Sequence, residues 1–216
     1  MLISNLKQPI TMKKSLVILC SIISVFSFAQ DNTDVDINYM LRGSVYANTS
    51  IFDSTSYGGY ASSDNSPKTQ NVKLVVKKNL FLKIDTTELI TFGEKYNGYK
   101  FYIGNNTDTI VKLEASDSRL YVVAEVFHRR KWRPIEFLPR SWCGNSYHNL
   151  FLKQNEFWEF NVPKFTGKIK SKLRYRLMIA PEKYIYSNEV AVGFNKGQLS
   201  KKEKHNPNGI MDPYED

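Results

Sequence analysis

Residues 120–132 read Leu-Tyr-Val-Val-Ala-Glu-Val-Phe-His-Arg-Arg-Lys-Trp. From Leu120 to Phe127 this stretch is apolar on both faces of an extended chain, with Glu125 as the exception. A half-exposed strand alternates apolar and polar residues, whereas a strand covered on both faces does not. We therefore predict that residues 120–128 form a central strand beneath a second sheet, and that a cationic connection leads into a strand at 132–137.

The flanking sequence repeats the strand signal. Short runs rich in Val, Ile, Leu, Tyr and Phe recur with a period of two, and no segment has a helical stripe. Turn residues such as Asn97-Gly98 and Ala180-Pro181 separate the runs. These patterns predict an all-β fold, an antiparallel β-sandwich. The other strands are expected at 72–76, 80–84, 99–103, 109–115, 149–152, 157–162, 168–179 and 186–194.

Part of this pattern resembles bacterial immunoglobulin-like domains. The features that carry the resemblance lie within about residues 97–195: an Asn-rich turn before the strand from Thr109, the hairpin with Trp132, a turn at Gly167, and a closing strand that begins Tyr186-Ser-Asn-Glu-Val190. The resemblance implies an immunoglobulin-like antiparallel β-sandwich in an exported protein and implies little about activity. The cysteine pair that bridges antibody domains is absent.

The N-terminus has the features of an export signal. Residues 1–29 contain three lysines and no acidic residue, and an apolar run from Leu16 to Phe28 ends before Gln30. The run is shorter than the about 20 apolar residues of a transmembrane helix. We predict a signal peptide over 1–29, an exported mature protein, periplasmic or secreted, and no transmembrane segment after cleavage. A start at Met12 gives the same signal. A lipid-anchored Cys20 is the disfavoured alternative, because Leu19 is bulky.

The mature chain has three parts of different composition. Residues 30–70 are rich in Asn, Asp, Ser, Thr, Gly and Tyr, which predicts a flexible leader or a loosely docked arm with one strand near Met40 to Tyr46. Residues 71–195 are expected to form the β-sandwich domain, and residues 196–216 a charged C-terminal tail. Loss of the signal lowers the formal charge from +9 to +6 and leaves Cys143 as the one cysteine. We expect one domain without an internal disulfide, and a charge that permits an anionic partner.

Five cations occupy alternate positions of one predicted strand, at Lys168, Lys170, Lys172, Arg174 and Arg176. Every second side chain of a strand shares a face, so the cations should form a row about 27 Å long at roughly 3.3 Å per residue. In an exported protein such a row favours an anionic envelope glycan over nucleic acid. The alternative is a solvated outer face whose lysines discourage aggregation and whose charge acidic neighbours neutralise.

A turn-rich loop, Ser141-Trp-Cys-Gly-Asn-Ser-Tyr-His148, is the second candidate site. A cysteine nucleophile needs a base within hydrogen-bond reach, and the sequence offers no third group to orient His148. The loop is interpreted as a protein contact rather than a catalytic site. The contact residues would be Trp142, Cys143, Tyr147 and His148. Cys143 has two further interpretations, a small buried residue and a bridge between two chains.

The C-terminus is similar to calcium-binding loops of the EF-hand and dockerin kind. With Gly209 as the sixth loop position, oxygen-bearing side chains fall at Asn206, Asn208, Asp212 and Glu215. The first position is Lys204 instead of Asp, which predicts weak binding. Calcium is therefore only an alternative to an exposed turn, and no other cofactor is expected.

No phosphate-binding loop, nucleophile elbow or zinc-protease motif occurs in the sequence. The chain is therefore interpreted as a non-enzymatic exported binding module for an anionic cell-envelope partner, without a role in nucleic-acid binding. The alternative is an inhibitor or accessory subunit that docks on another exported protein through its loops. An uncompensated basic row favours the first function, and a protruding apolar loop favours the second.

Overall fold

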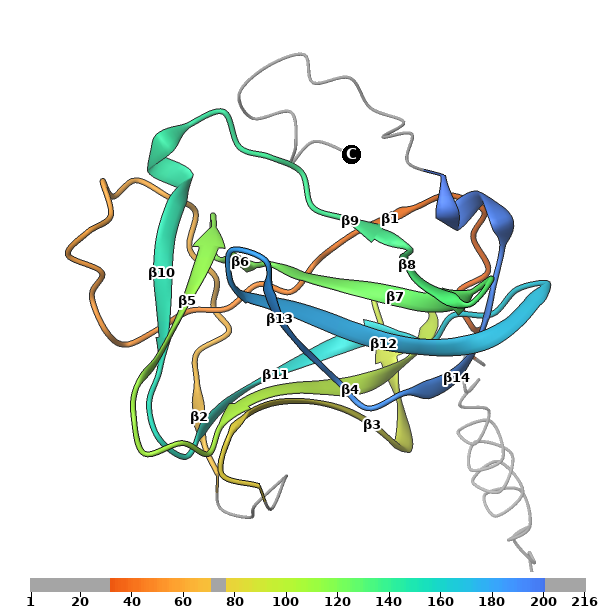
Figure 1. Cartoon of the computed structure of the whole chain (residues 1–216), viewed down its shortest axis with the longest axis horizontal. Helices are drawn as coiled ribbons and strands as arrows, with labels where there is room; N and C mark the ends of the chain where they lie inside the picture. Colours follow the sequence, from red (N-terminus) through yellow and green to blue (C-terminus); the bar gives the residue numbers. More distant parts are fainter. Residues whose placement is uncertain (1–31, 71–76, 201–216) are drawn as a thin grey trace, which may run out of the picture. The chain divides into compact units, whose positions relative to one another are not determined.

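The computed structural model describes residues 32–70 and 77–200 (Figure 1). These residues form an all-β fold in which the larger sheets are antiparallel, and they contain short 3₁₀ turns but no α-helix. The prediction of an all-β fold with antiparallel sheets is confirmed, and the arrangement is consistent with a β-sandwich. The predicted strand at 72–76 lies outside the described residues.

Two larger sheets supply most of the core. The four-stranded sheet has the order β2 (Lys68–Thr69), β11 (Glu156–Pro163), β4 (Tyr96–Asn105) and β3 (Leu80–Phe92). The five-stranded sheet has the order β13 (Lys183–Tyr186), β12 (Ile169–Ala180), β7 (Val122–His128) and β8 (Lys131–Pro134), and β14 (Val190–Phe194) also pairs with β12. Strand β7 pairs with one edge of β12. Strands β14 and β13 pair with its other edge, β14 with the first half of β12 and β13 with the second half.

Two smaller sheets complete the fold. Strand β10 (Tyr147–Leu152) pairs with β5 (Val111–Ser116), which pairs with β6 (Arg119–Leu120). The short strands β1 (Leu41–Arg42) and β9 (Glu136–Phe137) form a parallel pair. Two 3₁₀ turns, η2 (Gly144–Ser146) and η3 (Lys196–Leu199), precede β10 and follow β14.

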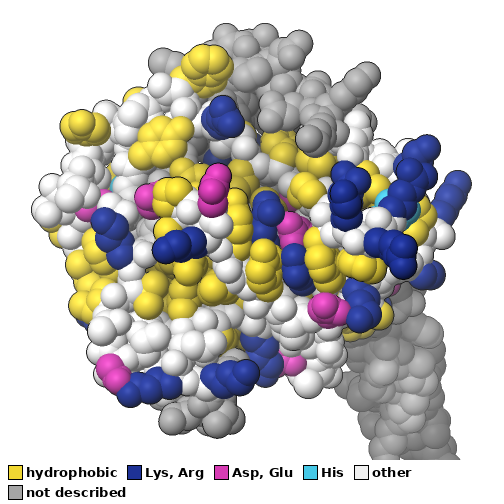
Figure 2. Space-filling model, viewed as in Figure 1, with side chains coloured by type: hydrophobic (Ala, Val, Ile, Leu, Met, Phe, Trp, Pro, Cys, Tyr) yellow, Lys and Arg dark blue, Asp and Glu magenta, His cyan; other side chains and the backbone are white. Residues whose placement is uncertain are grey.

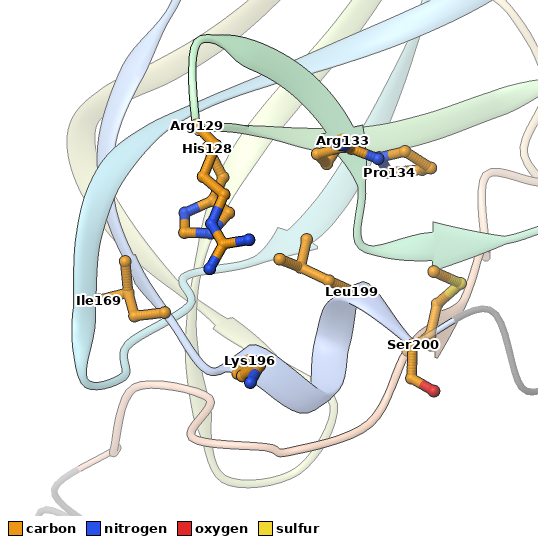
Figure 3. A pocket seen from close by; sticks show the side chains of 9 residues that line it. His128, Arg129, Arg133, Pro134, Ile169, Lys196, Leu199 and Ser200 are labelled. Carbon is orange, nitrogen blue, oxygen red and sulfur yellow. The ribbon is translucent and has the colours of Figure 1, made fainter.

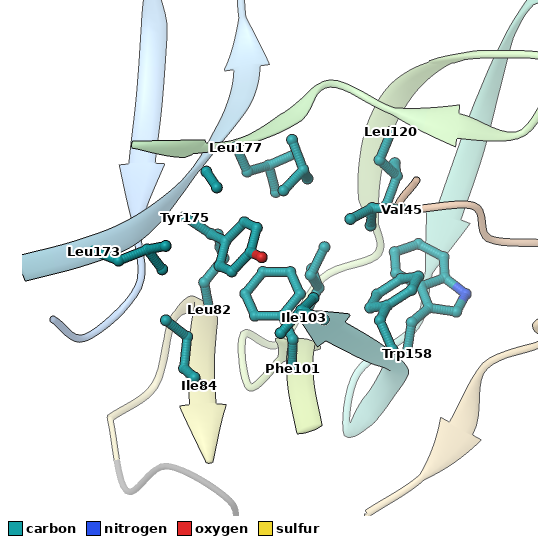
Figure 4. Packing of buried hydrophobic residues seen from close by; sticks show 14 of the residues in the cluster. Val45, Leu82, Ile84, Phe101, Ile103, Leu120, Trp158, Leu173, Tyr175 and Leu177 are labelled. Carbon is teal, nitrogen blue, oxygen red and sulfur yellow. The ribbon is translucent and has the colours of Figure 1, made fainter. Parts of the chain in front are cut away.

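The core forms because the inward residues of β12 alternate with polar ones. Leu173, Tyr175 and Leu177 are buried, and the Tyr175 ring lies 4.6 Å from the ring centroid of Phe101 on β4 (Figure 4). Trp158 of β11 is also fully buried, as the alternation of apolar residues in that strand predicts. Full burial of each such side chain contributes about 1.5–3 kcal/mol to folding.

Three predicted strands are wrong in their continuity. The central strand at 120–128 is two strands, because the chain leaves the sheet of β5 and enters that of β12 at Tyr121. The strand at 132–137 is likewise divided into β8 and β9. The strand at 186–194 is interrupted at Ser187 and Asn188, where the Asn188 side chain makes hydrogen bonds of 2.7 and 3.0 Å with both backbone groups of Ile84 on β3. Period-two patterning does not reveal these points, because residues on both sides of each break are extended.

Residues 32–70 pack against the sheets as a docked arm, one of the two alternatives that the sequence left open. Val35, Val45 and Ala47 belong to the core. Asp53 anchors the arm to β10: its carboxylate accepts hydrogen bonds from the backbone N–H and side chain of Thr55, at 3.0 and 2.6 Å, and of Asn149, at 2.7 and 2.9 Å. Burial alone would raise the pKa of Asp53, but these four donors outweigh it and lower the pKa to about 2.

We expect Asp53→Ala to lower the free energy of unfolding by about 2 kcal/mol at neutral pH, because it leaves two backbone donors without their acceptor. The arm should also become more accessible, which limited proteolysis of residues 48–65 would detect. Asp64→Ala is the matched control, since Asp64 is exposed on the same arm. Equal proteolysis of the two variants would contradict this role of Asp53.

A second carboxyl group, that of Glu136, lies in the core. Glu136 is buried, and its Oε2 accepts a 2.9 Å hydrogen bond from the backbone N–H of Ala124. Burial raises the pKa of Glu136 from its usual 4.5 to about 7, against the smaller opposite effect of that hydrogen bond. The folded chain therefore binds the proton more tightly than the unfolded chain does.

The free energy of unfolding should consequently fall as the pH rises from about 4.5 to about 7, by about 3 kcal/mol from this group. Glu136→Gln keeps an acceptor oxygen and carries no charge. The free energy of unfolding of this variant, relative to that of the original chain, should thus increase by about 3 kcal/mol as the pH rises across the same range. Urea unfolding at pH 4.5 and pH 8 measures the difference, and a difference that does not change with pH would refute the assignment.

Candidate functional site

The predicted cationic row is divided in two by acidic neighbours. Glu125 of β7 stands opposite Arg174 in the register, and its carboxylate lies 3.1 Å from Arg174 and 3.0 Å from Arg176. Lys172 lies 2.8 Å from Glu189. Three of the five cations are therefore paired within the protein, and the alternative of acidic neutralisation holds for this half of the row.

The two arginines of the row also stack on aromatic rings. The guanidinium carbon of Arg174 lies 4.1 Å from the ring centroid of Trp132 and 3.8 Å from that of Tyr186. Arg176 lies 4.6 Å from the ring centroid of Tyr184. Cation–π contacts of this kind stabilise the sheet by about 0.5–2 kcal/mol each. These arginines thus already make ion-pair and ring contacts within the five-stranded sheet.

The β7–β8 turn places further cations beside the other half of the row. His128 ends β7 and Lys131 begins β8, so the loop consists of Arg129 and Arg130 alone, with φ angles of 49° and 63°. Two-residue hairpins with positive φ at both central positions favour Asn-Gly, because other residues pay about 1–2 kcal/mol for that conformation. This turn therefore retains two arginines at a cost in backbone strain.

Several unpaired cations lie together at this end of the fold, which we call the basic end. The Ser171 hydroxyl donates to the carbonyl of Phe127, and Ile169 pairs with Phe194, so the start of β12 and the end of β14 flank the hairpin. Figure 2 shows Lys and Arg side chains gathering on one side around a His. Among residues 32–70 and 77–200, no ion pair includes any member of the basic end. The basic end comprises Arg129, Arg130, Lys131, Arg133, Lys168, Lys170 and Lys196.

A cavity of about 530 Å³ opens at the basic end (Figure 3). Its basic side chains come from the β7–β8 hairpin and from η3, and its apolar side chains come from β8, β12, η3 and the residue before β1. Of the residues that the structure describes, no acidic one lines it. The cavity is thus lined by both basic and apolar side chains, which we call its positive wall and its apolar wall. The lining residues are Met40, His128, Arg129, Arg133, Pro134, Ile169, Lys196, Leu199 and Ser200.

The turn η3 is held in place by a capping box. The backbone N–H of Asn195 donates to the Gln198 side chain at 2.8 Å, and Asn195 in turn donates to Asp36 at 2.6 Å. Gly197 lies against the arm so closely that a Cβ atom would stand 1.9 Å from the carbonyl oxygen of Asn38. The sequence Asn-Lys-Gly-Gln therefore fixes η3 on residues 36–38, which positions the side chains of Lys196 and Leu199.

The structure separates the residues of the predicted contact loop. Trp142 and Tyr147 are 73% and 43% exposed, Cys143 is half-buried and His148 is 5% exposed. The His148 ring stacks on Tyr60 at 3.6 Å, and its Nδ1 lies 3.0 Å from the carbonyl oxygen of Ser146. Burial lowers the pKa of His148, and no hydrogen bond in the described part of the chain joins it to Cys143. Of the four predicted contact residues, Trp142 and Tyr147 are therefore the exposed ones.

The predicted calcium ligands, Asn206, Asn208, Asp212 and Glu215, lie outside the described residues. Within residues 32–70 and 77–200, no three His, Cys, Asp or Glu side chains gather as metal ligands would. Nor does the described part of the chain contain a helix that combines the length and hydropathy needed to cross a membrane. No family model, curated protein or solved structure matches the chain significantly.

Sequence reasoning identified Lys168 and Lys170 but missed most of the basic end. The run His128-Arg-Arg-Lys131 was visible as a connection between strands. Four consecutive basic residues around a tight hairpin turn are the signal that could have indicated the basic end. Lys196 gave no such signal, because its position depends on the contact of η3 with the arm.

Replacing Arg129-Arg130 by Asn-Gly should stabilise the fold by about 1–2 kcal/mol, since Asn and Gly adopt positive φ at little cost. The same variant removes two cations from the basic end. Thermal or urea unfolding measures the gain. The control Arg129→Gln/Arg130→Gln removes the same charge without relieving the backbone, so it should show no comparable gain; equal stability of both variants would exclude strain at this turn.

Proposed function

We propose that this chain is a non-enzymatic exported binding module, an immunoglobulin-like β-sandwich that holds an anionic partner of the cell envelope at its basic end. The observation that carries the proposal is the concentration of seven cations, none of them in an ion pair with a described acidic side chain. Such a cluster attracts anions over a range of about 8–10 Å at ordinary salt. Export rests on the apolar N-terminal segment, and the immunoglobulin-like assignment on the sequence resemblance.

The strained turn supports the same function. Positive φ at both turn positions matches the twist of a hairpin and also occurs at Asp117 and Ser118, but arginine is an unfavoured residue for this conformation. Strained positions of this kind cluster at functional sites. The turn also joins two paired strands, which limits the entropy that a ligand must remove on binding.

The function should appear as retention on a heparin column. We expect Arg130→Gln/Lys168→Gln/Lys170→Gln to elute at clearly lower salt than the unaltered chain, with affinity reduced on the order of ten-fold, since each exposed ion pair contributes about 0.2–1 kcal/mol. The matched control is Lys77→Gln/Lys112→Gln/Lys183→Gln, which removes three exposed cations from other parts of the surface. Identical elution of the two triple variants would mean that net charge, rather than the basic end, determines retention.

A second candidate function has its own observation. Large aromatic side chains protrude from two neighbouring loops: Phe52 and Tyr57 are 81% and 84% exposed, and Trp142 is 73% exposed. The loops adjoin through the Tyr60–His148 stack and the hydrogen bonds between Asp53 and Asn149. Aromatic residues with this exposure are typical anchors of protein interfaces. With this surface the chain would act as an inhibitor or accessory subunit that docks on another exported protein. Trp142→Ala would then weaken capture of that protein without changing heparin retention.

A further inference from the structure

We propose that the cavity at the basic end binds an anionic amphiphile, with the carboxylate or phosphate head against Arg129, Arg133 and Lys196 and the apolar body against Met40, Ile169 and Leu199. The inference rests on the proposed function, which it deepens from anion binding in general to one chemical class. A polysaccharide anion would need the cations but would have no use for the apolar wall.

The lining of the cavity combines two chemically different kinds of side chain. Arg129 and Leu199 extend toward each other across the space in Figure 3, with Ile169 beside them. Met40, Ile169 and Leu199 are each half-buried, so part of their apolar surface remains open to the cavity beside the cations. A ligand that carries one charged end and one apolar end satisfies both kinds at once.

The size of the cavity agrees with a small ligand. Its volume of about 530 Å³ falls in the range of small-molecule sites, roughly 300–1,000 Å³, and such sites are apolar with a few convergent polar groups. The cations on this site also occupy fixed elements. Arg133 lies on β8, and Lys196 lies in η3, which the capping box and the arm hold in place.

Among residues 32–70 and 77–200, no acidic side chain competes with the ligand's head group at the cavity. A ligand anion therefore does not have to displace an ion pair between described residues, as it would at Arg174 or Arg176. Arginine forms paired hydrogen bonds with both carboxylate and phosphate, so the geometry admits either head. The apolar wall, by contrast, should discriminate by the length of the ligand's chain.

Isothermal titration calorimetry with acetate, hexanoate, octanoate and decanoate, below their micelle concentrations, tests the inference on the unaltered chain. Affinity should increase with chain length, by up to about four-fold per fully buried methylene, and level off when the cavity is filled. Octanol should bind at least ten-fold more weakly than octanoate. Octyl phosphate compared with inorganic phosphate separates a lipid-like ligand from a free phosphate.

Two variants assign the binding to the two walls. Arg133→Gln/Lys196→Gln should weaken octanoate about ten-fold, whereas Met40→Gln, which nearly conserves volume, should flatten the dependence on chain length. Lys112→Gln is the control and should change neither result. Near-ultraviolet circular dichroism establishes that each variant keeps the native packing.

The outcomes distinguish the two proposals. If the unaltered chain neither stays on heparin nor binds octanoate, the proposed function itself is overturned. Retention on heparin with octanoate no tighter than acetate would overturn only the amphiphile, and so would octanol binding as tightly as octanoate.

Discussion

The carboxylate of Glu125 is the constraint on which the arrangement of charge depends. It is almost fully buried on the face of the five-stranded sheet, and a buried carboxylate is costly unless cations neutralise it. Arg174 and Arg176 meet this need from the neighbouring strand, and the rings of Trp132 and Tyr186 both contact the Arg174 guanidinium. This cluster uses two of the five cations of the row, and Glu189 pairs with a third, Lys172, so only Lys168 and Lys170 of the row remain for a ligand.

The basic end is therefore a product of sheet register rather than of one strand. Strand β7 runs toward the hairpin while β12 runs away from it, and β14 returns to the same end before η3 begins. Cations from three separate stretches of sequence consequently meet at one place. The aromatic loops with Phe52 and Trp142 lie on the opposite side of the fold in Figure 1, which separates a charged surface from an apolar one.

The sequence predicts the local structure much better than the connections. Alternation in residues 157–162 and 173–177 correctly assigns which side chains face the core, because burial on one face imposes a period of two. The same period cannot show that the chain changes sheets at Tyr121, since each segment is extended on its own. Nor does it show that Val45 and Ala47 complete the core, because a few apolar residues in a polar stretch carry no periodic signal.

The candidate site was predictable only in its residue types. Lys168 and Lys170 belong to an obvious pattern, but the cavity also needs Met40 from the arm and Leu199 from η3, and their meeting depends on the Asn195 contacts with residues 36 and 37. A site assembled from distant segments exists only while those segments are docked. Any ligand of the cavity must consequently stabilise the docking of the arm and η3, since it binds the assembled form and not the separated one. Binding and the integrity of this end of the fold are therefore thermodynamically coupled.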